Sequence, residues 1–161
     1  MLDGLMSKQL VPRVVQRLQV TIGRLVIPEP VLNDVLFCTN NPAVMCRYQL
    51  EWPDGAETQR SSGVWVSTPA GSTCALSSAG GPILPLTALQ FAFLVREPYS
   101  PPGQGTRFRS AVLAQGEVLK LECRVPEASV FLDGSHRRYD VPFGEHVSFR
   151  LHQKPLHLVR P

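Results

Sequence analysis

The sequence lacks the patterns that identify several common classes of protein. Its four cysteines form no Cys-x-x-Cys pair and no Cys/His cluster with zinc-ligand spacing, so we expect reduced thiols, a cytoplasmic location and no metal-binding residue. No apolar run is long enough to cross a bilayer, and Asp3 argues against a signal peptide, so we expect no membrane association. The net charge of +3 includes no block of basic residues, which argues against nucleic-acid binding.

Common enzyme motifs are missing as well. The chain has no Gly-x-Ser-x-Gly elbow, no hydrolase-triad spacing, no Gly-x-Gly-x-x-Gly turn of a Rossmann dehydrogenase and no Gly-x-x-x-x-Gly-Lys-Ser/Thr phosphate loop. The histidines and most of the arginines are interpreted as surface or structural residues. We therefore assign no catalytic residue to this chain.

The sequence does contain the alternation that is typical of half-buried strands. Cys46, Tyr48 and Leu50 alternate with polar residues, and the same pattern recurs over residues 119–125. A chain of 161 residues with 43% hydrophobic content can bury one ordinary core. We therefore expect a fold of the all-β class, built mostly of strands, in which residues 1–161 form a single domain.

The expected elements are mostly strands. They cover residues 14–27, 31–37, 44–52, 63–67, 119–125, 128–132 and 146–151. Short helices are expected in three places: in a segment before Pro12, over residues 72–78 and over residues 86–93. Ser72 or Thr73 could cap the second helix and place its N–H groups where they favour negative charge. Asp133 and Gly134 indicate a hairpin turn, and Asp133 receives no catalytic role.

Residues 61–82 carry the clearest indication of ligand chemistry. A short apolar strand there runs directly into a loop of serines, threonines and glycines. Such a loop lets the backbone approach a polyanionic or dinucleotide ligand closely. An ordinary connection between a strand and a helix has the same composition, so the loop alone does not decide between the two interpretations.

Six segments along the chain occur in an order that resembles a known family. They are residues 32–35 (Leu-Asn-Asp-Val), 60–63 (Arg-Ser-Ser-Gly), 67–73 (Ser-Thr-Pro-Ala-Gly-Ser-Thr), 78–82 (Ser-Ala-Gly-Gly-Pro), 96–98 (Arg-Glu-Pro) and 130–134 (Val-Phe-Leu-Asp-Gly). Together they resemble the C-terminal domain of ATP-dependent NAD kinases, and residues 39–47 are similar to the NADH-preferring branch. The resemblance covers nearly the whole chain and implies a β-sandwich domain with a few short helices.

The resemblance also implies which residues bind the dinucleotide. The family's Asn-Glu/Asp pair holds the adenosine part of NAD or NADH, and its Thr-Pro-x-Gly-Ser turn lines the dinucleotide pocket. The matching residues here are Asn33, Asp34, Thr68, Gly71, Ser72, Thr73 and Ser78. An amide can pair with adenine edges and hydroxyls with ribose or phosphate, while a glycine leaves room for the ligand.

The chain departs from the family's pattern in three respects. Ser62 stands where many members have aspartate, and Ala75 stands where they have tyrosine, which changes the groups near the nicotinamide end. The family's Gly-Gly-Asp-Gly motif binds ATP phosphates and activates the ribose 2′-hydroxyl, and it belongs to an N-terminal α/β domain that would precede residue 1. Phosphoryl transfer by ATP and Mg²⁺ would need that domain, so we expect the chain alone not to catalyse it.

Several interpretations of the chain are compatible with these departures. The chain could be a truncated gene product, could act with a separately encoded N-terminal half, or could be a non-catalytic dinucleotide sensor. The resemblance also implies a homo-oligomer. A β-rich protein-interaction module without a nucleotide, and a lipid kinase of related architecture, are alternatives from other functional classes.

Overall fold

The structure, a computed structural model, describes residues 11–103 and 105–159. It consists of strands joined by short connections, with one 3-10 turn and one short helix. The strands are β1 (Arg13–Val15), β2 (Leu18–Ile22), β3 (Leu25–Val26), β4 (Asp34–Thr39), β5 (Cys46–Trp52), β6 (Gly55–Ser61), β7 (Gly63–Ser67), β8 (Gln90–Arg96), β9 (Ser110–Ala114), β10 (Leu119–Cys123), β11 (Ala128–Leu132), β12 (Arg137–Val141), β13 (His146–Leu151) and β14 (Leu156–Leu158). The expectation of an all-β fold is confirmed.

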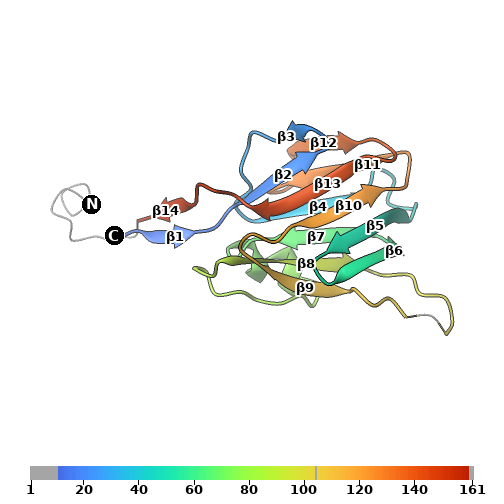
Figure 1. Cartoon of the computed structure of the whole chain (residues 1–161), viewed down its shortest axis with the longest axis horizontal. Helices are drawn as coiled ribbons and strands as arrows, with labels where there is room; N and C mark the ends of the chain where they lie inside the picture. Colours follow the sequence, from blue (N-terminus) through green and yellow to red (C-terminus); the bar gives the residue numbers. More distant parts are fainter. Residues whose placement is uncertain (1–10, 104, 160–161) are drawn as a thin grey trace.

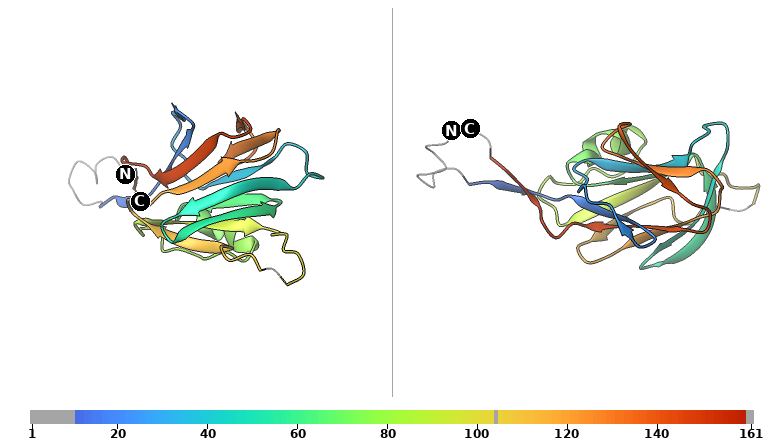
Figure 2. Two further views of the ribbon diagram at one scale, coloured as in Figure 1. Left: turned by 45° about the vertical axis from the view of Figure 1, so that its right-hand side comes forward. Right: turned by 90° about the horizontal axis from the view of Figure 1, so that it is seen from above.

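Two six-stranded antiparallel sheets form the body of the molecule. The first sheet has the order β3-β2-β13-β10-β5-β6, and the second has the order β12-β11-β4-β7-β8-β9. The two sheets lie face to face in two layers (Figure 2). Strands β1 and β14 pair with each other and extend away from the sandwich as a two-stranded ribbon (Figure 1).

The core fills the space between the facing sides of the two sheets. In β5, Cys46, Tyr48 and Leu50 are fully buried while the residues between them are not, as the period of two requires. The Tyr48 ring meets the Phe37 ring of the other sheet edge to face, with 5.8 Å between centroids. The Tyr48 hydroxyl is hydrogen-bonded to Ser61 at 2.8 Å, so its polar atom is satisfied inside the core.

The strand predictions were right where the alternation is strong, and two of them need correction. The strand expected over residues 14–27 is broken into three, and a turn at Gly23, whose φ is +55°, separates β2 from β3. The strand expected from residue 31 begins only at Asp34, since Val31 forms an isolated bridge with Leu18. Strands β7, β11 and β13 have the predicted bounds.

The helix expected over residues 86–93 is wrong. Residues 90–96 form β8, which pairs with β7 on one side and β9 on the other and buries Phe91, Phe93 and Val95 in the core. Pairing with strands on both sides outweighs the helix-like spacing of the leucines before it. Strands β6, β9 and β14 have no counterpart in the sequence-based prediction, whereas β12 is the strand expected to follow the hairpin turn at Asp133 and Gly134.

The helix expected over residues 72–78 is present only as two short pieces. A 3-10 turn, η1, covers Gly71–Thr73, and a four-residue helix, α2, covers Ala75–Ser78. Cys74 precedes α2 and no side chain caps it, so the prediction of a cap by Ser72 or Thr73 is wrong. No helix in the described ranges is long and apolar enough to span a bilayer. The helix expected before Pro12 falls largely on residues 1–10, which lie outside the described residues.

Candidate functional site

Asp133 holds the segment that leads into β4. It occupies the tip of the β11–β12 hairpin, as predicted, with a positive φ of 49°. Its carboxylate accepts hydrogen bonds from the backbone N–H groups of Leu32, at 2.9 Å, and Asn33, at 2.6 Å. Its own N–H donates to the Asp34 carbonyl at 2.9 Å. The hairpin therefore fixes the backbone of Leu32, Asn33 and Asp34 with one hydrogen bond to each.

The loop after β7 contacts the same segment from the other side. The Thr68 N–H donates to the Asn33 carbonyl at 2.9 Å, and the Thr68 hydroxyl donates to the Leu32 carbonyl at 2.5 Å. Gly71 packs directly on Asn33, because a Cβ at position 71 would lie 2.2 Å from the Asn33 carbonyl oxygen. A glycine is required there by the close approach of two backbones. Asn33, Asp34, Thr68 and Gly71 thus come together, as the resemblance implied.

The remaining three predicted residues lie on η1 and α2. Ser72 is fully buried, and its hydroxyl donates to the Pro69 carbonyl at 2.8 Å while accepting from the Leu84 N–H at 3.0 Å. Thr73 and Ser78 are exposed, and the Ser78 hydroxyl donates to the Cys74 carbonyl at 3.1 Å. The Thr68 and Ser72 hydroxyls therefore serve the shape of the loop, and contact of any of these residues with a ligand stays a prediction.

A small apolar cluster anchors this loop to the outer face of the second sheet. Leu76 of α2 is fully buried together with Leu84 and Ala92, and Trp65 and Leu94 pack against them. Gly81 lies so close to Leu76 that a Cβ there would be 2.7 Å from its Cγ. The position of the predicted loop thus depends on packing that lies outside the main core.

A groove of about 420 Å³ runs along the outer face of the second sheet, and of the seven predicted residues Asp34 is the one that lines it. Its floor is formed by the half-buried side chains of Leu36, Trp65 and Phe131. Asp34 lines the groove and is only 9% exposed. Burial, and then the nearby Asp133 carboxylate, raise the pKa of Asp34 above its ordinary value. The groove combines an apolar floor with a hydrogen-bonding acid, which suits a planar ring with polar edges.

Cys38 lies on the same face of β4 and keeps the floor uncharged. Burial raises the pKa of its thiol, although the guanidinium groups of Arg96 and Arg138 act in the opposite direction. The thiol is therefore protonated at neutral pH, and it behaves as a small apolar side chain.

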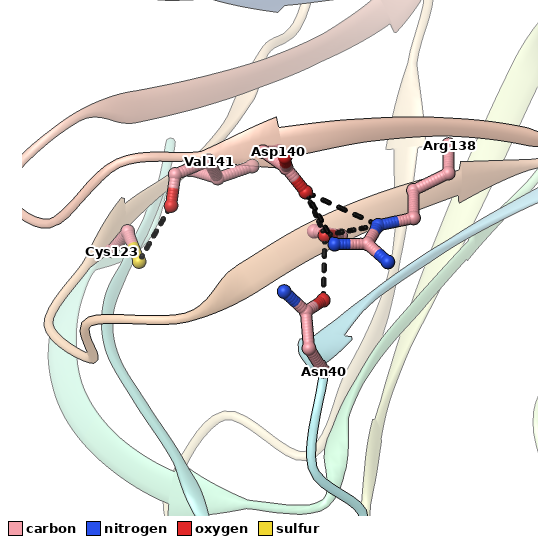
Figure 3. Close-up of polar contacts among 6 residues, drawn as sticks. Asn40, Cys123, Arg138, Asp140 and Val141 are labelled. Atoms are coloured by element: carbon pink, nitrogen blue, oxygen red, sulfur yellow. Dashed lines mark hydrogen bonds and ion pairs between the residues drawn. The ribbon is translucent and has the colours of Figure 1, made fainter.

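A polar cluster lies on the outer face of the same sheet, next to Asn40, another groove-lining residue (Figure 3). The buried Ser129 hydroxyl lies 2.7 Å from Asn40 Oδ1 and 2.9 Å from Asp140 Oδ1, and it accepts a hydrogen bond from Arg138 Nε at 3.0 Å. Arg138 also pairs with Asp140 at 2.6 Å and lowers its pKa, with Ser129 adding to the effect. Asn40 is therefore held in a fixed orientation at the groove.

Sequence reasoning missed the groove floor, Asn40 and the anchoring role of Asp133. The run Val35-Leu36-Phe37-Cys38 is apolar on both faces of β4, which is a signal that both faces are covered. Nothing in the sequence pairs Asp133 with Asn33, since 100 residues separate them. Among the described residues, no group of three His, Cys, Asp or Glu side chains could hold a metal ion.

Comparisons with known proteins show what the chain is similar to. The family model described as the ATP-NAD kinase C-terminal domain matches residues 32–161. A probable NADH kinase of Oryza sativa subsp. japonica is 32% identical over 150 residues, which cover 89% of this chain and 45% of that protein. An NAD kinase of Methanopyrus kandleri is 51% identical over 55 residues, or 33% of this chain and 20% of that protein.

The fold has a clear counterpart among solved structures. The crystal structure of yeast NADH kinase complexed with NADH matches with a TM-score of 0.83 at 17% sequence identity. The match covers 99% of this chain and 47% of the yeast chain. The chain thus spans less than half the length of these relatives.

Proposed function

This chain belongs to the ATP-NAD kinase family, and from that premise we propose that it forms the dinucleotide-binding part of an NAD(H) kinase. The proposed reaction transfers the γ-phosphoryl group of ATP to the 2′-oxygen of the adenosine ribose of NADH or NAD. The 2′-hydroxyl loses its proton, ADP leaves, and NADPH or NADP is formed. The observation that carries this proposal is the meeting of Asn33–Asp34 with the Thr68–Gly71 turn, at the point where Asp34 lines the 420 Å³ groove.

Each predicted residue has a task in this proposal. The Asn33 side-chain amide can donate and accept hydrogen bonds at the adenine edge or the ribose, while its backbone stays fixed by Asp133 and Thr68. The Asp34 carboxylate can accept hydrogen bonds from ribose hydroxyls. The exposed Thr73 hydroxyl can donate to a phosphate oxygen, and the Ser78 hydroxyl can do so only by giving up its hydrogen bond to the Cys74 carbonyl, whereas Gly71 and Ser72 fix the shape of the loop.

The residues that the structure describes do not fit a Mg²⁺ site. Magnesium needs several oxygen ligands in octahedral geometry, and the two carboxylates of Asp34 and Asp133 are the acids that this segment offers. The Asp133 oxygens are already occupied by two backbone N–H groups. Metal and ATP phosphates would therefore be held by groups outside the described residues.

The proposal includes partners for the chain. An α/β domain, either in a longer protein or separately encoded, would supply the phosphate-binding and base groups, and a second copy of the chain would complete a homo-oligomer. The length of the relatives supports the first part, because the chain covers 45% of the rice protein and 47% of the yeast kinase chain.

Replacement of Asn33 by alanine tests the proposed site. The backbone hydrogen bonds at residue 33 survive the change, so the midpoint of thermal unfolding should stay the same. Loss of the amide should weaken NADH binding about tenfold, as expected for one or two hydrogen bonds, measured by calorimetric titration. Asn41→Ala in the loop after β4 is the matched control and should bind NADH like the wild type. Unchanged affinity of Asn33→Ala would remove Asn33 from the site.

A further inference from the structure

Among the described residues, four strands form the edges of the two six-stranded sheets, and three of these edges are protected. An edge strand presents a row of backbone N–H and C=O groups that lack a neighbouring strand, and proteins usually shorten, charge or cover such a strand. Strand β3 has two residues, and β12 carries Arg137, Arg138 and Asp140. The segment after β8 covers β6, because the Tyr99 N–H donates to the Arg60 carbonyl at 2.8 Å. Strand β9, at the border of the molecule in Figure 1, is the fourth edge.

Strand β9 has an uncharged edge whose backbone groups point outward at every second residue. Its five residues, Ser110–Ala114, include no charge and no proline. The Val95 N–H of β8 donates to the Arg109 carbonyl at 2.8 Å, just before β9 begins. Bonded and unbonded residues alternate along each side of an antiparallel strand, so residues 111 and 113 are bonded to β8 as well. The backbone groups that face the free edge are therefore those of Ser110, Val112 and Ala114.

Side chains close this edge at both of its ends. The Ala114 N–H donates to the Glu117 carboxylate at 2.6 Å, and the Ala114 carbonyl accepts from the Glu117 N–H at 3.1 Å. At the other end, the Phe108 N–H donates to the Glu57 carboxylate at 2.9 Å, and the Phe108 carbonyl accepts from the Gln59 side-chain amide at 2.8 Å. Pairing with another strand is therefore blocked beyond these two positions.

Between the closed positions, the edge is open at Ser110 and Val112. No residue in the described part of the chain is hydrogen-bonded to the outward backbone groups of these two residues. They lie symmetrically about Ala111, so the open edge is complementary to itself: in an antiparallel pair of two copies, Ser110 of each copy stands opposite Val112 of the other. Arg109 then faces Leu113 of the second copy, so no like charges stand opposite each other.

The exposed side chain of β9 also fits a pairing of two copies. Val112 is 37% exposed and pairs with Ala92 of β8, which places both side chains on the same face of the second sheet. Ala92 belongs to the small apolar cluster that holds α2 on the outer face. A second copy at the edge would cover Val112 and extend this apolar surface across the new pair of strands.

We propose that two copies of the chain associate through β9, with Ser110 of each copy opposite Val112 of the other, so that their second sheets join into one continuous sheet. The inference names a surface for the second copy that the proposed function includes, and it rests on the proposed function only for the expectation of a homo-oligomer. Glu117 and Glu57 restrict the pairing to this register, because they occupy the next outward-facing groups on either side. A five-residue edge buries less area than a standard interface, so the dimer should be weak.

Sedimentation velocity of the 161-residue chain without nucleotide, over about a hundredfold range of concentration, tests this inference. The wild type should change from monomer to dimer as its concentration rises. Val112→Pro removes an N–H that faces away from β8, so the pairing within the chain is kept while dimerisation should weaken about tenfold. Val112→Thr keeps the N–H and the branched side chain, and it should dimerise like the wild type.

Ala114→Pro is the matched control, because it places proline on the same edge at a group that Glu117 already occupies. It should leave the dimerisation constant unchanged, even if it lowers the stability of the fold. Ser110→Pro repeats the test at the first residue of β9, where a strand tolerates proline best, and it decides the question if Val112→Pro does not fold.

Three results would overturn the inference. They are a chain that stays monomeric at every concentration, dimerisation of Val112→Pro and Ser110→Pro like the wild type, and an equal loss of dimerisation in Ala114→Pro. Because no nucleotide is present, these failures differ from a failure of the proposed function. A monomeric chain that binds NADH would overturn the β9 dimer alone, whereas a β9 dimer that binds no dinucleotide would overturn the proposed function alone.

Discussion

Individual side chains explain why the Asn33–Asp34 segment has one conformation. Asp133 accepts two backbone hydrogen bonds with its carboxylate, and it does so from a left-handed backbone conformation that most residues disfavour. Removal of its side chain would leave two backbone donors without their partners. The residue acts through the segment that it holds, so it is a positioning residue.

Asp133→Gly should destabilise the protein by about 1–3 kcal/mol, because glycine keeps the positive φ while the two hydrogen bonds are lost. Asp133→Asn keeps one acceptor and should cost less. Urea unfolding of both variants measures the difference, and NADH affinity should fall in the same order. Equal stability of Asp133→Gly and the wild type would show that the carboxylate does not hold the segment.

The raised pKa of Asp34 predicts how the stability of the fold depends on pH. Its pKa is raised by burial and by Asp133, so the folded state binds this proton more tightly than the unfolded state does. The stability that it contributes is present at pH values below its unfolded pKa and is lost as the pH rises through the raised folded pKa. Ionised Asp34 therefore destabilises the fold at neutral pH.

Replacement of Asp34 by asparagine should consequently increase the free energy of unfolding at pH 7 and change it little at pH values near 3, where aspartate is largely protonated. Urea titrations at the two pH values measure the effect. A variant that is less stable than the wild type at pH 7 would contradict the assigned environment. An acid that lies buried beside a groove and lowers the stability of the fold is typical of a binding site.

Among the elements, α2 has the weakest local signal and the strongest dependence on packing. It has four residues and no side-chain cap, so its own hydrogen bonds do not sustain it. The contacts of Leu76 with Leu84 and Ala92 hold it against the second sheet. The loop that carries Thr68, Gly71 and Ser72 therefore depends on this cluster.

Leu76→Ala should destabilise the protein by about 2–4 kcal/mol and lower NADH affinity, because a fully buried leucine leaves a cavity under the loop. Ile83→Ala, in the same segment but at a side chain that is 65% exposed, is the control and should have little effect on stability. Thermal unfolding and calorimetry give the two readouts. A Leu76→Ala chain with wild-type affinity would show that the loop does not take part in binding.

The strands that the sequence predicted differ from those that it did not predict in how much of each strand its neighbours bury. Strand β13 alternates strongly because one of its faces is core and the other is not, whereas β11 is a short, mostly apolar run that is covered on both faces. Strands β6 and β9 are edges of their sheets, and each exposes much of its length, so their patterns are weak. The wrong prediction of a helix at β8 has another cause. Leu86, Leu89 and Phe93 have the spacing of a helix, and the strand forms because this segment pairs with β7 in the folded sheet.

At the level of the whole molecule, the family resemblance correctly indicated the sandwich and the family. Spacing along the chain could not indicate the contacts that hold the site, because Asn33 meets residues that are 34 to 100 positions away. Function in this fold depends on where strands end, and sequence order does not reveal that.

If the described sandwich carries the dinucleotide-binding part of an NAD(H) kinase, the folded chain should bind a dinucleotide. The most direct measurement is a calorimetric titration of the folded 161-residue chain with NADH and, in parallel, with NAD. We expect saturable binding of at least one dinucleotide, weakened by Asn33→Ala and unaffected by Asn41→Ala. A folded chain that binds neither dinucleotide at millimolar concentration would contradict it.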